Sequence, residues 1–298
     1  METPWRKYFD PRTLARLHSL TLRARRIVEG YLAGRHHSAA KGFSIEFAEH
    51  REYSPGDDLR YVDWKVFGRT DKFYLKRFED ETNLTCYLLL DVSRSLTYCS
   101  DSAGMSKLEY AKCLAAVFAW LVLHQQDAVG LVTFDTSMRK YIPAKSMASQ
   151  VRMVLEELVS TEPGGETGVA EIFHDIAERI HRRGIVIIIS DLFDDPEEII
   201  KALRHFDYRK HEVIVFHVMA EEELTFPFKK FSNFRNLENA DHKLKIDPRS
   251  VKADYLEKVR SFIRKLEVGC GQMQADYVPF TTSRPFDRAL ADYVTRRS

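Results

Sequence analysis

The sequence lacks the long apolar runs of a membrane protein. Its longest uninterrupted apolar stretch, residues 114–123, holds ten residues, whereas a membrane-spanning helix needs about 18 or more. Residues 1–6 include no apolar stretch that resembles a signal peptide. We therefore expect a cytoplasmic protein without a transmembrane segment.

Paired cysteines and a charge of one sign are also missing. The cysteines show no Cys-x-x-Cys spacing, so we expect neither a zinc cage nor a disulfide framework; they are Cys86, Cys99, Cys113 and Cys270. The net charge of +1 argues against a general nucleic-acid binder. Residues 1–43 are the exception, with nine Lys or Arg against three Asp or Glu. This segment is either a helix with a solvated basic face or a contact for nucleic acid or lipid headgroups.

Several enzyme motifs are absent as well. The chain has no Gly-x-x-x-x-Gly-Lys-Ser/Thr loop, no Gly-x-Gly-x-x-Gly, no Gly-x-Ser-x-Gly and no His-Glu-x-x-His. The sequence does have ample core material, with 44% apolar and 12% aromatic residues in 298. We expect a folded protein that is not an enzyme.

The pattern of residues divides the chain in two. Asp10-Pro11 opens a predicted helix that runs to about residue 28. Residues 30–82 are rich in aromatic residues and turn signals, which predicts short strands and loops, not helices. We expect residues 1–82 to form an N-terminal helix plus a β-rich segment, and residues 83–298 to form the main domain.

In the main domain, short apolar runs alternate with helical patterns. Predicted strands cover residues 86–90, 129–134, 139–142, 185–189, 213–218 and 275–278, and predicted helices cover 106–126, 147–158, 168–183, 195 onward, 251–269 and 285–296. Continuously apolar strands that alternate with helices indicate a parallel sheet covered on both faces. The fold class is therefore α/β, with a doubly wound, open and mainly parallel sheet.

Oxygen-bearing side chains follow two of these strands. Asp91-x-Ser93-x-Ser95 comes after the first strand, Asp191 comes after the strand at 185–189, and Thr167 lies at a helix entrance between them. The carboxyl ends of parallel strands are where such sheets bind ligands. Carboxylates and hydroxyls suit a hard cation, with Mg²⁺ favoured over Mn²⁺ and Ca²⁺. Only two carboxylates leave the ion partly uncompensated, and therefore open to an acidic ligand from a partner.

Other interpretations of the same residues remain open. Ser93, Ser95 and Thr167 are also typical of turns and helix caps, and Thr161 is a second candidate for the hydroxyl ligand. A Mg²⁺-dependent phosphohydrolase is the alternative function. Against it, Ser93 stands where an Asp-x-Asp phosphatase loop has its second aspartate, and no general base stands nearby in the sequence.

The Asp-x-Ser-x-Ser, Thr and Asp pattern resembles the metal-ion-dependent adhesion site of von Willebrand factor type A domains. An upstream block is similar to the signature of the bacterial family called domain of unknown function 58, as is the later block at residues 222–228, and this resemblance runs from about residue 30 to the C-terminus. The upstream residues that carry it are Glu46-Phe47, Arg51-Glu52-Tyr53, Pro55-Gly56-Asp57-Asp58-Leu59-Arg60, Asp63-Trp64-Lys65 and Arg69-Thr70.

The resemblance implies a type A domain that serves as a non-enzymatic interaction module. It implies an adaptor or co-chaperone that works beside an AAA+ ATPase of the MoxR group, in complex assembly, metal-centre maturation or stress tolerance. The charged residues of the upstream block, among them Arg60 and Asp63, either form an ion-pair network that holds this segment or dock a partner.

Overall fold

The computed structural model describes residues 45–52, 63–70, 72–80, 84–165, 168–229, 232–235 and 243–297. The described residues up to 80 belong to a small compact unit, and those from Leu84 onward belong to a larger one. The predicted helix at residues 10–28 and the basic segment at 1–43 lie outside the described residues. The division at residues 82 and 83 therefore stays a prediction.

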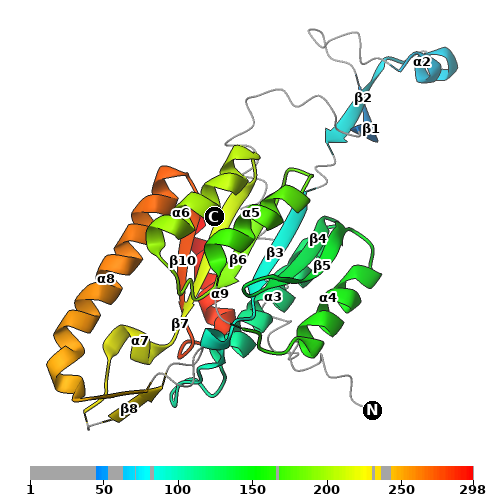
Figure 1. Cartoon of the computed structure of the whole chain (residues 1–298). Coiled ribbons are helices and arrows are strands. Elements are labelled where there is room, and N and C mark those ends of the chain that lie inside the picture. The colour runs from blue at the N-terminus through cyan, green and yellow to red at the C-terminus, as the bar shows by residue number, and fades with distance from the viewer. Residues whose placement is uncertain are drawn as a thin grey trace. The chain divides into compact units, whose positions relative to one another are not determined.

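The larger unit is built on a six-stranded sheet with the order β10-β7-β6-β3-β4-β5. All neighbouring strands run parallel except β5, which is antiparallel to β4. The prediction of an open, mainly parallel sheet is confirmed (Figure 1). The strands are β3 (Thr85–Asp91), β4 (Ala128–Phe134), β5 (Met138–Lys145), β6 (Ile185–Ser190), β7 (Glu212–Met219) and β10 (Asp276–Thr281).

Helices cover both faces of this sheet (Figure 1). One face carries α5 (Val169–Arg179), α6 (Pro196–Tyr208) and α8 (Pro248–Gln272). The other carries α3 (Lys107–His124), α4 (Ser149–Ser160) and α9 (Phe286–Arg297). Two of these helices begin where the sequence predicts them, each at a capping residue: the Ser106 hydroxyl accepts the Glu109 amide at 3.2 Å, and the Asp195 carboxylate accepts the Glu197 amide at 2.8 Å.

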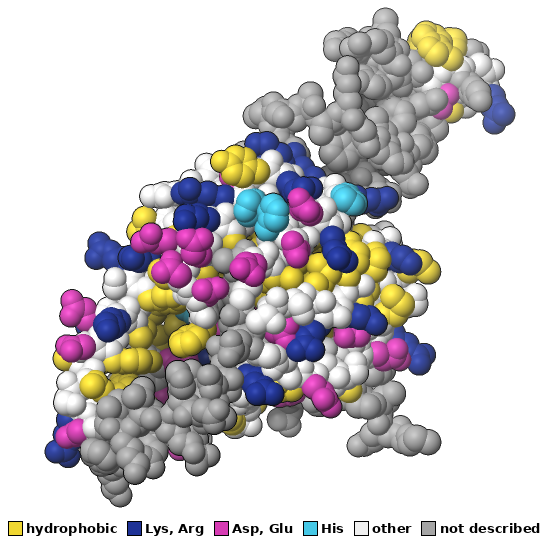
Figure 2. Space-filling view, in the orientation of Figure 1, with side chains coloured by type: hydrophobic (Ala, Val, Ile, Leu, Met, Phe, Trp, Pro, Cys, Tyr) yellow, Lys and Arg dark blue, Asp and Glu magenta, His cyan; other side chains and the backbone are white. Residues whose placement is uncertain are grey.

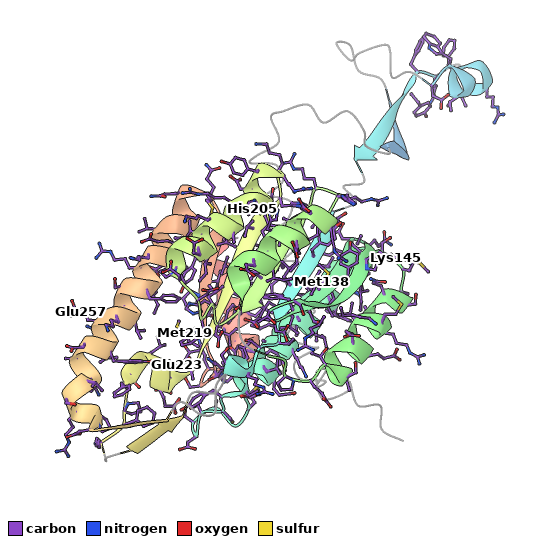
Figure 3. The ribbon with its side chains drawn as sticks, viewed as in Figure 1. Met138, Lys145, His205, Met219, Glu223 and Glu257 are labelled. Atoms are coloured by element: carbon purple, nitrogen blue, oxygen red, sulfur yellow. The ribbon has the colours of Figure 1, made fainter. Side chains whose placement is uncertain are left out.

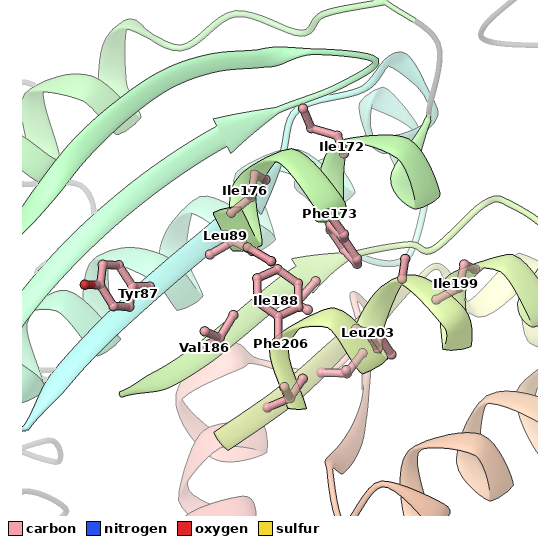
Figure 4. Packing of buried hydrophobic residues seen from close by; sticks show 14 of the residues in the cluster. Tyr87, Leu89, Ile172, Phe173, Ile176, Val186, Ile188, Ile199, Leu203 and Phe206 are labelled. Carbon is pink, nitrogen blue, oxygen red and sulfur yellow. The ribbon is translucent and has the colours of Figure 1, made fainter. Parts of the chain in front are cut away.

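The main core lies between the sheet and the α5–α6 layer (Figure 4). Leu89 of β3 and Ile188 of β6 meet Phe173 and Ile176 of α5 and Phe206 of α6, all of them fully buried. Burial of each such side chain contributes about 1.5–3 kcal/mol. This packing fixes the two central strands, β3 and β6, and with them the position of the residues at their ends.

The short elements differ most from the sequence-based expectations. In the small unit, β1 (Ile45–Glu52) pairs antiparallel with β2 (Tyr74–Asp80), as a β-rich segment predicts. The prediction of no helices was wrong for α2 (Trp64–Thr70). The Asp63 carboxylate accepts the Val66 amide at 3.3 Å, and the rings of Trp64, Phe67 and Phe73 pack together, which stabilises a helix that aromatic residues alone do not favour.

Three further short elements follow β7 in the larger unit. They are α7 (Glu221–Thr225) and the antiparallel pair β8 (Ser232–Arg235) and β9 (Lys243–Ile246).

Asp63 is seen here as a helix cap, while its predicted partner Arg60 lies outside the described residues. Among the helices that the structure describes, none combines the length and the apolar character that a membrane crossing requires.

Candidate metal-binding site

The two central strands each deliver an aspartate to the carboxyl edge of the sheet. β3 ends at Asp91, and β6 ends at Ser190, directly before Asp191. β3 and β6 pair in parallel up to Leu90 opposite Ile189. β4, the next strand in the sequence, lies on one side of β3, and the later strand β6 lies on the other side. Ligands bind in α/β sheets at this reversal of strand order. The structure therefore places both predicted carboxylates at the expected edge.

Asp91 is fully buried and held from both sides. Its Oδ1 accepts the Ser93 amide at 2.8 Å, and its Oδ2 accepts the Ser190 hydroxyl at 2.6 Å. Burial raises the pKa of Asp91 to about 7, and the negative charge of Asp191 adds to the rise, although these hydrogen bonds oppose it. Two carboxylates that disfavour each other's charge are stabilised by a cation between them.

The serines of the Asp-x-Ser-x-Ser loop point to each other instead of capping a helix. Ser93 precedes the 3₁₀ helix η3 (Arg94–Thr97), yet its side chain makes no capping hydrogen bond there. Its hydroxyl lies 3.0 Å from the hydroxyl of Ser95, and both serines are buried. Adjacent ligands of an octahedral Mg²⁺ with bonds of 2.0–2.1 Å are about 3.0 Å apart. The spacing of the two hydroxyls therefore fits one edge of such an octahedron.

The two carboxylate oxygens of Asp191 differ in their hydrogen bonding. Its Oδ2 accepts a hydrogen bond from the Lys107 ammonium at 2.8 Å. Its Oδ1 is buried and has no hydrogen-bond partner among the residues that the structure describes. Buried carboxylate oxygens are normally bonded. This oxygen is therefore available to a cation.

Lys107 is a residue of this edge that the sequence did not reveal. It is 2% exposed, and its ammonium also donates to Glu223 Oε1 of α7 at 2.7 Å. Burial by itself lowers the pKa of an ammonium group, but Asp191 and Glu223 outweigh it and raise the pKa of Lys107. The one local signal is that a lysine at the first position of a helix opposes the helix dipole.

The main chain at Asp191 is fixed by a buried histidine. His217 Nε2 donates to the Asp191 carbonyl at 3.0 Å, and Nδ1 bonds the Tyr277 hydroxyl. Burial lowers the pKa of His217 to about 4, so the ring is neutral near pH 7. Because both ring nitrogens are engaged, His217 serves as a support and is not placed to act as a general base.

A third loop lies beside the Asp-x-Ser-x-Ser loop. The Arg94 amide donates to the Gly165 carbonyl at 3.0 Å, and the Gly164 amide donates to the Val92 carbonyl at 2.5 Å. Asp135, just after β4, accepts the Gly165 amide at 2.8 Å and is bonded to Arg139. Gly164 and Gly165 are therefore fixed by hydrogen bonds to residues that follow β3 and β4.

The predicted hydroxyl ligand Thr167 lies outside the described residues, so its role stays a prediction. Thr161, the second candidate, is engaged elsewhere: its hydroxyl donates to the Glu157 carbonyl at 2.7 Å and closes α4. Of the five predicted ligands, the structure gathers Asp91, Ser93, Ser95 and Asp191 at one edge.

The carboxylate and hydroxyl oxygens at this edge suit a hard cation. Within the part of the chain that the structure describes, no group of three or more His, Cys, Asp or Glu side chains is arranged to hold a metal. A site here therefore depends on the hydroxyls of Ser93 and Ser95 beside the carboxylates. Such a donor set fits Mg²⁺, and it does not fit zinc, which prefers sulfur and nitrogen.

Comparison with known proteins places most of the chain in one family. The model of the family described as "Protein of unknown function DUF58" matches residues 49–262. Among curated proteins, the uncharacterized proteins Rv1480 of Mycobacterium tuberculosis and Mb1516 of Mycobacterium bovis are each 28% identical over 221 residues, which is 73% of this chain and 68% of theirs.

Solved structures with partial likeness come from several sources. The conserved hypothetical protein BatB of Bacteroides thetaiotaomicron shares 18% identity at a TM-score of 0.45, over 72% of this chain and 98% of its own. An aerotolerance-related membrane protein of Bacteroides fragilis shares 16% identity at 0.45, over 72% and 99%. The SpRpn10 VWA domain shares 10% identity at 0.42, over 71% and 95%.

Proposed function

Because the chain belongs to the DUF58 family, whose description names no activity, we propose a function from the site itself. The protein is a non-enzymatic, divalent-metal-dependent protein–protein interaction module. The proposed ion is Mg²⁺, with Mn²⁺ or Ca²⁺ as substitutes. The proposed ligands are Asp91, Ser93, Ser95, Thr167 and Asp191.

One observation carries this proposal: Oδ1 of Asp191 is buried and has no hydrogen-bond partner among the described residues. It belongs to a carboxylate beside the buried carboxylate of Asp91 and at the same sheet edge as two hydroxyls 3.0 Å apart. A buried polar atom without a partner is unfavourable, and a cation removes the penalty.

The partner's chemistry follows from the small ligand charge. The hydroxyls are neutral, and Lys107 already engages one oxygen of Asp191. A divalent ion here retains positive charge and accepts a further carboxylate, so the proposed contact is an acidic side chain of a partner or client protein. The family resemblance suggests an AAA+ ATPase of the MoxR group as the partner, with this protein as adaptor or co-chaperone. A partner that binds equally well in EDTA and in Mg²⁺ would contradict this.

The metal site is tested by melting curves of Asp191→Ala and wild type with and without Mg²⁺ or Mn²⁺. An ion that binds only the folded chain stabilises it by about 2.7 kcal/mol at a hundredfold excess over Kd. We expect the ion to raise the melting temperature of wild type and to leave Asp191→Ala unchanged. Asp175→Ala, at an exposed position of α5, is the control and should keep the full rise.

Two results would refute the site: a wild type indifferent to every divalent cation, or an Asp191→Ala variant with the full metal-induced rise. Without metal, Asp191→Ala should still fold, because it removes a charge that repels Asp91. Calorimetric titration with Mn²⁺ gives the affinities directly.

The alternative functions receive less support from this geometry. A phosphohydrolase needs a general base, and the imidazole that contacts the site, His217, has both nitrogens bonded. Nucleic-acid or lipid binding rests on residues 1–43, outside the described residues. On the face shown in Figure 2, basic and acidic side chains are intermixed over the described surface.

A further inference from the structure

We infer that Lys107 is a positioning residue that sets the charge of the candidate metal site. Its ammonium holds Oδ2 of Asp191, leaves Oδ1 facing the ion position, and lowers the affinity of the free protein for a divalent cation. Glu223 adjusts this effect by holding the ammonium from the other side. The inference rests on the proposed metal-dependent function and concerns how that site is regulated.

The placement of Lys107 runs against local preferences. It is the first residue of α3, after the Ser106 cap, where the helix dipole disfavours a cation. It is also buried, although lysine is rarely fully buried unless it is paired. Two carboxylates from different elements compensate it: Asp191 after β6 and Glu223 in α7.

These contacts divide the Asp191 carboxylate between two cations. Oδ2 bonds the ammonium at 2.8 Å, while Oδ1 is buried and unbonded within the described part of the chain. A fixed Oδ2 restricts the rotation of the carboxylate, so Oδ1 keeps one direction. An ammonium bonded to one oxygen of a carboxylate repels a divalent cation bound to the other oxygen.

Glu223 anchors the other side of the ammonium. Its Oε1 accepts from Lys107 at 2.7 Å and its Oε2 accepts the Ala220 amide at 2.7 Å. Figure 3 labels Met219 at the end of β7 and Glu223 on α7 just beyond it. The ammonium therefore lies between a proposed ligand, Asp191, and a carboxylate, Glu223, that is not among the proposed ligands.

The charges of this connected group act on a divalent ion in opposite directions. The proposed ligands Asp91 and Asp191 carry negative charge when ionised, the Lys107 ammonium opposes it, and the Glu223 carboxylate offsets the ammonium. Removal of the lysine charge leaves more negative charge for the ion, and removal of the Glu223 charge leaves less. The two changes must therefore move metal affinity in opposite directions.

The experiment is a calorimetric titration of Mn²⁺ into the full chain as wild type, Lys107→Met and Glu223→Gln. Met keeps the length of the lysine side chain without its charge, and Gln keeps the shape of the glutamate. We expect Lys107→Met to bind Mn²⁺ about tenfold more tightly or better, and Glu223→Gln to bind about tenfold more weakly or worse. If Lys107 only held the fold together, both variants would weaken binding or leave it unchanged, and that result would overturn the inference.

Two further variants complete the test. Lys112→Met removes another buried lysine of α3, whose ammonium donates to the Thr161 carbonyl at 2.7 Å, and should leave Mn²⁺ affinity within about twofold of wild type. An equal gain in Lys112→Met and Lys107→Met would refute the specific role. If Lys107→Met does not fold, the double variant Lys107→Met/Glu223→Gln must bind Mn²⁺ more tightly than Glu223→Gln alone, and a failure to do so overturns the inference.

The outcome also separates this inference from the proposed function. Binding of Mn²⁺ by Lys107→Met but not by wild type would support the role of Lys107 and refute a metal-dependent wild type. Binding by neither protein would overturn both. Binding by wild type with unchanged affinity in both single variants would keep the proposed function and refute the role of Lys107.

Discussion

Two serines of this chain precede helical turns, and only one of them caps. The Ser106 hydroxyl accepts the Glu109 amide at 3.2 Å at the start of α3. Ser93 holds the equivalent position before η3 but makes no such bond, and its hydroxyl lies beside Ser95 instead. The same residue type thus caps a helix at one position and joins the hydrogen bonds of the candidate metal site at the other.

This difference predicts that one alanine substitution mainly lowers stability and the other mainly lowers metal affinity. Ser106→Ala should lower the free energy of unfolding by about 1 kcal/mol, because α3 loses its cap. Ser93→Ala should change metal-free stability less and lower Mn²⁺ affinity by about tenfold or more, because one proposed ligand is lost. Urea unfolding in EDTA and calorimetry measure the two quantities. A Ser93→Ala variant with wild-type Mn²⁺ affinity would return this serine to a structural role.

At the scale of elements, strands and longer helices were predictable because their signals are local. The apolar runs at residues 86–90 and 185–189 lie within β3 and β6, and Asp195 caps α6 as its sequence indicates. Shorter elements such as α7, with five residues, are too short for a periodic pattern.

The candidate site was predictable only in part, for the same physical reason. Asp91 and Asp191 directly follow recognisable strands, so the geometry of a parallel sheet brings them together. The partners of Lys107 lie 84 and 116 positions away in the chain, and no local pattern encodes such contacts. That a buried oxygen of Asp191 finds no hydrogen-bond partner in the described part of the chain is likewise a property of tertiary packing.

The loop after α4 offers a matched pair of glycine substitutions. A Cβ added at Gly164 would lie 2.0 Å from Asp135 Oδ2, whereas at Gly165 the same oxygen would be 3.8 Å away. Asp135 cannot yield easily, because Arg139 and the Gly165 amide hold it. We expect Gly164→Ala to displace the loop that leads to Thr167 and to lower Mn²⁺ affinity by about tenfold.

Gly165→Ala is the control and should bind Mn²⁺ like wild type. Calorimetry on both variants, with melting curves in EDTA to confirm folding, makes the comparison. Equal affinities in the two variants would show that this loop does not shape the site.

At the scale of the whole molecule, a buried histidine lies at the end of the sheet opposite the candidate metal site. His211 is buried directly before β7, between the rings of Tyr87 and Phe206. Burial lowers the pKa of His211 below its ordinary value of 6.5. The folded protein therefore resists protonation at a position where the unfolded chain accepts it.

This shift predicts how stability depends on acidity. A histidine with a depressed folded-state pKa contributes its full stability above the unfolded value of 6.5, and the contribution is lost as the pH falls below that value. In EDTA, acidification from pH 7.5 to pH 5.5 should lower the free energy of unfolding of wild type relative to that of His211→Gln, because Asp91 titrates in both proteins and His211 in wild type alone. His174→Gln, at an exposed position of α5, serves as the control. The same slope in His211→Gln and wild type would contradict the prediction.

Asp91 ends β3 and Asp191 directly follows β6, and each of these two strands is hydrogen-bonded to a neighbouring strand on both sides. The main chain there cannot shift without breaking ladders on either flank, so the donor atoms keep their spacing before any ion arrives. These side chains lose their conformational entropy when the chain folds, so binding a ligand there costs less entropy. If the proposed site binds Mg²⁺, the slow dehydration of that cation would set the rate of ion exchange. A bound partner would accordingly be released by competition at the ion, while the scaffold beneath it stays still.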